Sequence, residues 1–323
     1  MSSTTRTGDD RLYWRAQGER NRGLMGLFTV VAVFVALYAY LFPGLLSVAG
    51  VSKFAQSWLP LALVAMAQAI LMLTGGISLA IGATVSLGAV IAATTMNGYF
   101  GVAGGLVAVS AAGLAIGALC GVIAIRLRLP AIIVTLAASF IIGGLALLIL
   151  PRPGGAIPGW FSDLLAGNTP AALVLVFLAA LLWKLYLATP LGLSLYAAGE
   201  NPVGAYRAGV PVDAARIAAY AISGLLSTLA GLFIAAQTGS GDPVIGQAFT
   251  LNSIAAAVLG GVGFLGGRGT MRGAIAGSLL LSVMINVMFF LGFPPVAQYV
   301  AQGLIIIGAV ALPQITARFR RRP

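Results

Sequence analysis

The chain lacks histidine altogether and has one cysteine among its 323 residues. Imidazole acid–base catalysis is therefore excluded, and so are disulfides and metal sites built from cysteine and histidine. The lone Cys120 lies inside an apolar run without a basic residue close by to stabilise a thiolate, which favours a packed core residue over a reactive thiol.

Acidic side chains are also scarce, and none lies inside a long apolar stretch. The seven are Asp9, Asp10, Glu19, Asp163, Glu200, Asp213 and Asp242. Carriers driven by protons or sodium keep an ionisable group at membrane depth, so this distribution argues against a self-powered carrier and against an intramembrane hydrolase. The phosphate-binding pattern G-x-x-x-x-G-K-[ST] is missing too, so we expect no ATP site of that type in this chain.

Apolar residues make up most of the sequence instead: 60% are hydrophobic and 8% are charged, against roughly a quarter charged in globular proteins. Apolar stretches recur at about the length that crosses a bilayer as a helix, which predicts an all-α polytopic membrane protein. The ten predicted spans are 24–42, 54–73, 79–97, 104–125, 130–150, 170–187, 214–235, 251–265, 273–291 and 297–313. The span 251–265 is short enough to be tilted, broken or re-entrant.

The positive charges predict the orientation. With ten spans and a cytoplasmic N-terminus, sixteen of the 18 Lys and Arg residues fall on the cytoplasmic side, leaving Lys53 and Arg152 outside. We therefore expect both termini in the cytoplasm of a bacterial inner membrane, with a cytoplasmic segment 1–23, a permease domain 24–313 and a basic tail 314–323. The net charge of +11 follows this rule and does not indicate nucleic-acid binding.

Glycine is abundant, with 43 residues, and it recurs four apart in Gly113, Gly117 and Gly121. Small residues at this spacing let two membrane helices approach closely. The pattern predicts tight helix packing and says nothing about a transported molecule.

The longest predicted cytoplasmic segment between spans is about 188–213. Within it, Asn201 can cap a short helix that begins at Pro202 and is stopped by Gly209. Such a projecting helix suits docking of a partner protein and simple connection of two spans equally well.

Four stretches together resemble one family. Ala198–Val212 is similar to the cytoplasmic coupling loop of ribose-type permease subunits of bacterial ABC importers, in the branched-chain amino acid/ribose permease superfamily. Leu73–Gly82, Thr135 with Leu136 and Gly143, and Ile254–Thr270 fit the same family in the same order, and the resemblance runs from about 54 to 312.

The resemblance implies a non-catalytic subunit that pairs with a second permease copy or a paralogue within membrane lipid. Cargo would come from a periplasmic binding protein, and partner ATPase subunits would bind ATP and magnesium, so this chain would need no cofactor of its own. The residues that match the coupling loop, and that we expect to contact the ATPase, are Gly199, Glu200, Asn201, Ala205, Arg207, Gly209 and Val210.

Two neighbouring positions depart from the family. Members that carry sugars commonly have Asp where this chain has Ser78, and Ser where it has Ala80. Ribose itself is therefore less well supported as cargo. Ser78 also suits a purely structural role as the N-cap of a helix that starts at Leu79.

Neutral polar and aromatic residues in or beside the spans are the remaining indication of cargo, although such groups more often bridge helices. The residues proposed for the translocation path are Gln68, Ser78, Ser86, Thr135, Ser139, Phe140, Asn252, Ser253 and Asn286. Asp242 and Gln247, on the outer segment 237–250, are proposed for the face that meets the binding protein. This lining suits a sugar or polyol.

Other cargo and other functions stay open. Related permeases carry nucleosides, branched-chain amino acids or a furanosyl signalling molecule. From a different class, a membrane enzyme or a lipid-handling scaffold is the alternative, and no usual catalytic constellation can be assembled for an enzyme.

Overall fold

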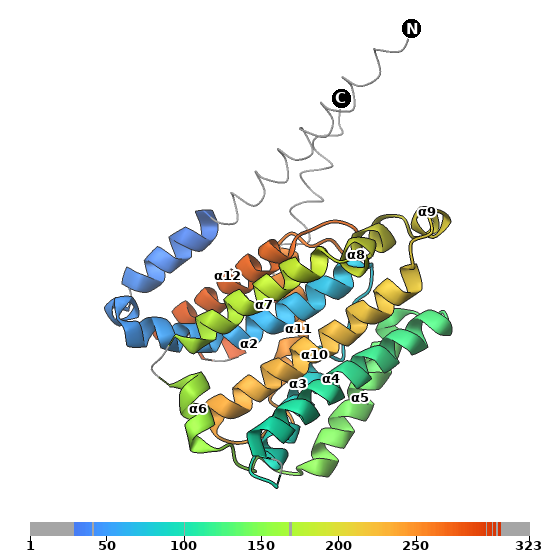
Figure 1. Ribbon diagram of the computed structural model, residues 1–323. Helices are drawn as coiled ribbons and strands as arrows, with labels where there is room; N and C mark the ends of the chain where they lie inside the picture. The colour runs from blue at the N-terminus through green and yellow to red at the C-terminus, as the bar shows by residue number, and fades with distance from the viewer. Residues whose placement is uncertain are drawn as a thin grey trace, which may run out of the picture.

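The computed structural model describes residues 29–40, 42–99, 101–167, 170–294, 296–298, 300–301 and 303–304. The predicted segments 1–23 and 314–323 lie outside these residues, as do parts of the predicted spans 24–42 and 297–313. In the described residues the chain is helical without a β-strand, and the helices pack side by side in a bundle (Figure 1). One isolated backbone bridge joins Gly154 and Gly241.

The elements follow one another as a series of helices. A helix Thr29–Tyr40 is followed by η1 (Pro43–Leu46), α2 (Val48–Leu73), α3 (Ile81–Thr95), α4 (Gly101–Arg126), α5 (Ala131–Ile149), α6 (Gly159–Ala166), α7 (Ala171–Leu187), α8 (Pro190–Glu200), α9 (Pro202–Arg207), α10 (Val212–Thr238), α11 (Gln247–Leu259) and α12 (Met271–Phe290).

Five helices among the described residues are long and apolar enough to cross a membrane, namely α2, α4, α5, α10 and α12. A sixth span results if α6 and α7, which meet at a bend of 73°, are counted together. These helices coincide with six of the predicted spans. The polytopic helical class is thus confirmed, while the count of ten stays a prediction.

Two predicted spans differ from the helices found. α3 and α11 have 15 and 13 residues, short of the roughly 20 that a crossing needs. The prediction of helix through 265 was wrong, because α11 ends at Leu259 and glycines with positive φ follow, including Gly261 at 76°.

The start of α3 also differs from the prediction. α3 begins at Ile81 rather than Leu79, so its N-cap is Ala80 and the predicted cap at Ser78 was wrong.

Close backbone contact fixes the centre of the bundle. α2 is the most enclosed of the five long helices, because 89% of an apolar stretch of 18 residues within it is buried. It packs against α7, α10, α11 and α12. Where α4 crosses α10, a Cβ added at Gly117 would lie 2.1 Å from the carbonyl oxygen of Tyr220. The predicted packing through small residues is therefore found at this crossing.

The loops gather at two opposite ends. At one, which we call the α9 end, the backbone N–H of Gly267 donates to the carbonyl of Leu73 at 2.9 Å, and Gly199 lies against both. At the other, the α6 end, Gly154 and Gly241 exchange backbone hydrogen bonds of 2.9 and 2.8 Å. The distribution of Lys and Arg predicted which loops lie on the same side of the membrane. In the structure, these loops meet at the same end of the bundle.

Candidate functional site

A cavity of about 570 Å³ opens between α3, α5 and the segment that leads into α11. We call it the α3–α5 cavity. Its lining is formed by Leu79, Ala83, Ser86, Leu136, Ser139, Phe140, Gly143, Gly144, Leu147, Pro243, Val244, Gln247 and Thr250. Every one of these side chains is uncharged, so the cavity offers hydroxyl, amide and apolar surface together.

Three residues predicted for the translocation path line this cavity. Phe140 is 75% exposed, and the half-buried Ser139 donates its hydroxyl to the carbonyl of Leu136 at 2.7 Å. Ser86 is buried and accepts from the N–H of Gly246 at 2.9 Å, which fixes the loop before α11. The helix α5 thereby presents an aromatic ring and a hydroxyl on the same wall.

Gln247 was predicted for the face that meets a binding protein, and the structure places it in this wall. It is exposed in the first turn of α11, with Thr250 one turn further on. Asp242 does not line the cavity: its carboxylate accepts from the N–H of Val244 at 2.9 Å and shapes the approach to α11.

The other residues predicted for the path lie outside the α3–α5 cavity. Thr135 is fully buried, donating to the carbonyl of Ala131 at 2.8 Å and accepting from the N–H of Leu79 at 3.1 Å, so it joins α5 to the start of α3. Ser78 accepts from the N–H of Ala80 at 3.2 Å.

The remaining four occupy the helix packing. Ser253 donates to the carbonyl of Thr250 at 2.9 Å. Asn286 donates to the carbonyl of Ser282 at 2.8 Å. Asn252 is buried, and the amide of the fully buried Gln68 has no partner among the described residues. Gln68, Asn252 and Ser253 are separated from the cavity by burial, whereas Asn286 is half-buried on α12.

Sequence reasoning missed Thr250, Gly143 and Gly144 as lining residues. A Cβ added at either glycine would meet nothing within 4 Å, so packing within this chain does not require them. The signal was present in the spacing: Leu136, Phe140, Gly143 and Leu147 recur three and four apart and share one face of a helix.

The segment between α7 and α10 forms a second candidate site at the α9 end. Asn201 caps α9 as predicted, its side-chain oxygen accepting from the N–H of Gly204 at 2.9 Å. α9 ends at Arg207, and Gly209 follows with a φ of 80°, as its predicted role in stopping the helix requires. The preceding helix α8, capped by Thr189, was not predicted.

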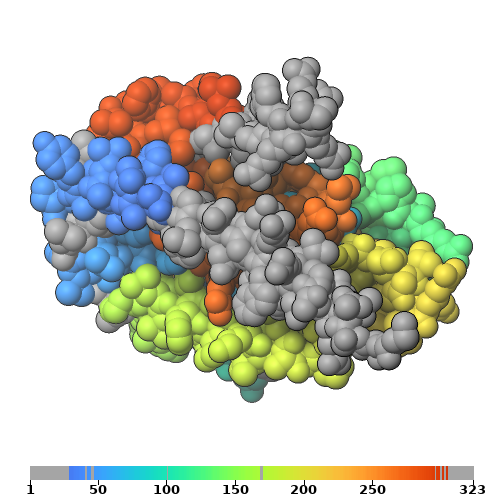
Figure 2. Space-filling view, turned by 90° about the horizontal axis from the view of Figure 1, so that it is seen from above, coloured from blue at the N-terminus to red at the C-terminus, as the bar shows by residue number. Residues whose placement is uncertain are grey.

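This segment has an inner and an outer face. Ala205 packs inward with Ala198 and Val212, with Val210 against them. Val203, Tyr206 and Arg207 are exposed, Tyr206 by 76%. α9 projects from a corner of the bundle in Figure 1, and α8 and α9 form the yellow surface seen from above in Figure 2.

The residues predicted to contact a partner divide between these faces. Glu200, Asn201, Arg207 and Gly209 are exposed. Gly199 is buried, and a Cβ there would lie 1.9 Å from the carbonyl oxygen of Leu73. Gly199 therefore holds α8 against the end of α2, and Val203 and Tyr206 are the exposed residues that the sequence did not single out.

The described residues contain no group of three or more His, Cys, Asp or Glu side chains that could hold a metal ion.

Comparison with known proteins places this architecture among transport components. Residues 50–310 match the family described as the permease component of branched-chain amino acid transport systems. The chain is 34% identical over 258 residues to the autoinducer 2 import system permease protein LsrC of Yersinia pestis (strain Pestoides F), covering 77% of this chain and 73% of that protein.

The protein of the same name from Yersinia pseudotuberculosis serotype IB (strain PB1/+) is 33% identical over 258 residues, with the same coverage of 77% and 73%. No solved structure matches the chain.

Proposed function

Since the chain belongs to the family of permease components of branched-chain amino acid transport systems, we propose that it is the membrane-spanning subunit of an ATP-driven, binding-protein-dependent importer. In this proposal ten helices cross the bacterial inner membrane, both termini are cytoplasmic, and the chain itself is not an enzyme. The resemblance of Ala198–Val212 to the coupling loop supports docking of cytoplasmic ATPase subunits at the α9 end.

The observation that carries the proposal is the α3–α5 cavity. It combines uncharged polar groups with an exposed aromatic ring, and it lies between the α9 end and the α6 end, where cargo would leave and enter. The α5 wall is open, with Phe140, Ile141 and Leu148 largely exposed. A second permease chain on this side would enclose the cavity as a path between the two subunits.

The lining favours a small, neutral, hydroxylated cargo. Ser139, Gln247 and Thr250 offer donors and acceptors to hydroxyl groups, and Phe140 offers a ring face for the apolar side of a sugar or polyol. A carboxylate or phosphate would call for a cationic group, which this wall lacks.

A furanosyl signalling molecule is the second candidate, and the names of the relatives favour it. They are permease proteins of autoinducer 2 import systems and match this chain over most of its length. The family description names branched-chain amino acids, whereas the names of these two relatives support neither that cargo nor nucleosides.

The following experiment separates ATP-driven import from proton-driven transport and from enzymatic turnover. The permease, its partner ATPase and its binding protein are reconstituted in vesicles, and uptake of ribose and of autoinducer 2 is measured with ATP held constant. We expect uptake to require ATP and the binding protein and to persist when an uncoupler collapses the proton gradient. Uptake that stops with the uncoupler, or turnover of a substrate without any ATPase, would refute the proposal.

A further inference from the structure

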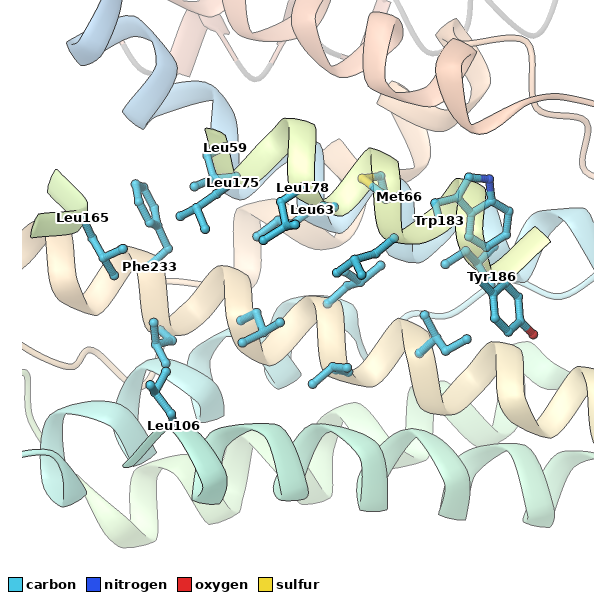
Figure 3. Close-up of a pocket in the computed structure, with 18 of the residues that line it drawn as sticks. Leu59, Leu63, Met66, Leu106, Leu165, Leu175, Leu178, Trp183, Tyr186 and Phe233 are labelled. Atoms are coloured by element: carbon cyan, nitrogen blue, oxygen red, sulfur yellow. The ribbon is translucent and has the colours of Figure 1, made fainter. Parts of the chain in front are cut away.

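A second cavity, of about 430 Å³, lies between α7 and α10 with α2 behind it (Figure 3). We call it the α7–α10 crevice. Its lining comes from α2, α4, α6, α7 and α10 and consists of apolar side chains with two exceptions that carry a polar atom, Trp183 and Tyr186. In Figure 3 these two mark one end and Leu165 and Phe233 mark the other.

The helix break between α6 and α7 creates this crevice. α7 packs against α2, α6, α8 and α12, and α10 packs against α2, α3, α4, α6, α8 and α9. The bend of 73° turns α6 across the foot of the crevice, where its Phe161 and Leu165 join the lining. Both helices thus rest on α2 while the space between them stays open.

The chemistry of the crevice excludes the proposed cargo. The α3–α5 cavity has two serines, a threonine and a glutamine in its lining, and the α7–α10 crevice has none of these residues. Water is also a poor occupant, because a buried water needs two to four polar partners. An apolar ligand is the remaining class.

The bilayer surrounding this chain supplies such a ligand. Leu178 and Leu182 on α7 line the crevice and are 45% and 56% exposed, so it reaches the surface that faces lipid. A dry apolar cavity of roughly 150 Å³ already binds benzene, and this one is about three times larger. Left empty, its lining would lose dispersion contacts that a hydrocarbon chain restores.

A polar group at the end of the crevice fits the head of such a chain. The hydroxyl of Tyr186 is buried without a hydrogen-bond partner among the described residues. Tyr186 lies in the last turn of α7, at the α9 end, where the ester groups of a bilayer lipid lie if α7 crosses the membrane. A slight turn of the ring would bring this hydroxyl to the crevice, where an ester carbonyl would accept the hydrogen bond that the protein leaves unmade.

We infer that the α7–α10 crevice binds one acyl chain of a bilayer phospholipid, with the ester end at Tyr186 and the tail toward Leu165. The site is separate from the cargo cavity and does not depend on the proposed cargo. α7 and α10 are the helices that enter and leave the α8–α9 segment, so the bound chain supports that segment between its two helices.

Tryptophan fluorescence tests this directly, because Trp183 lines the crevice and Trp58 does not. Both are buried, with 7% and 9% exposure, whereas Trp160 is 64% exposed. Variants that keep one of these three tryptophans and have phenylalanine at the other two and at Trp14 are reconstituted in phosphatidylethanolamine/phosphatidylglycerol vesicles with brominated acyl chains. When Trp58 is replaced, the hydroxyl of Ser278 loses the hydrogen bond from the indole N–H but still donates to the carbonyl of Ile275.

We expect the brominated chains to quench Trp183 nearly as strongly as Trp160 and to leave Trp58 unquenched. If the brominated chains quenched Trp183 as little as Trp58, the inference would be overturned. The space beside Trp183 would then be empty or filled by a protein segment.

A matched pair of substitutions on α7 sharpens the test. Leu178 lines the crevice and Leu181 does not, yet their exposures are 45% and 41%. In the variant that retains Trp183, Leu178→Phe should lower the quenching because the larger ring fills part of the crevice, whereas Leu181→Phe should leave it unchanged. Equal effects of the two substitutions would contradict a specific chain site.

Discussion

Gly209 shows how one residue can act through its backbone alone. Its φ is 80°, and a Cβ built there would meet nothing within 4 Å, so a side chain is opposed only by the left-handed conformation. The turn it forms places the N–H of Val210 on the carbonyl of Ala205 at 3.0 Å and closes α9. The site is therefore suited to a substitution that strains the turn without crowding it.

Gly209→Val should uncouple the permease while leaving its membrane abundance unchanged. A β-branched residue is strongly disfavoured at positive φ, and the left-handed conformation costs an L-residue about 1–2 kcal/mol. Gly209→Asn is the matched control, since asparagine tolerates this conformation. The measurement is stimulation of the partner ATPase by loaded binding protein: Asn should retain it and Val should lose much of it. Full stimulation in the Val variant would remove this turn from the coupling mechanism.

At the scale of whole helices, the same residue type serves two purposes. On α4, glycine is required by α10, because a Cβ at Gly117 would lie 2.1 Å from a backbone oxygen. On α5, Gly143 faces the α3–α5 cavity with nothing within 4 Å of the same position. One substitution made at both sites therefore separates packing from transport.

Gly117→Val should lower the melting temperature and the amount of folded protein, since overpacking costs about 1–3 kcal/mol and α10 cannot move away without disturbing α2 and α3. Gly143→Val should keep both near wild type and instead reduce uptake, because its side chain enters the cavity. Melting is followed by intrinsic fluorescence and uptake in reconstituted vesicles. Comparable thermal destabilisation of both variants would show that Gly143 is also a packing residue.

For the whole molecule, the two ends differ in charge. Among the described residues, Arg126, Arg128, Lys184, Arg207, Arg216, Arg268 and Arg272 lie at or near the α9 end, while Lys53 and Arg152 lie toward the α6 end. Tertiary packing thus collects on one face the charges that the sequence assigned to the cytoplasm. This agreement supports the proposed orientation.

Topology reporters provide the measurement. Fusions after Arg128, Arg207, Arg272 and Arg322 should report the cytoplasm, and fusions near Asp163 and Asp242 should report the periplasm, because positive charge is retained on the cytoplasmic side. A periplasmic signal after Arg207 would contradict both the ten-span arrangement and the placement of the ATPase at α9.

The sequence alone determined the features that depend on local chemistry. Long apolar runs predicted α2, α4, α5, α7, α10 and α12, because hydrocarbon admits helical backbone almost exclusively. Asn201 and Gly209 predicted both ends of α9, because a cap and a left-handed turn act within a few residues. The family resemblance also lay in the residue pattern and is confirmed by the match over 50–310.

Only the tertiary structure decided which polar residues share a cavity. Ser86 and Ser139 line one together with Gln247, whereas Thr135, on the same helix as Ser139, is buried against the start of α3. On an isolated helix Thr135 and Ser139 would look alike. The rotation of α5 against its neighbours decides that one is buried and the other lines the cavity. The α7–α10 crevice could not be predicted from the sequence either, because its leucines look like ordinary residues of membrane spans. The crevice arises because the bend before α7 holds that helix away from α10.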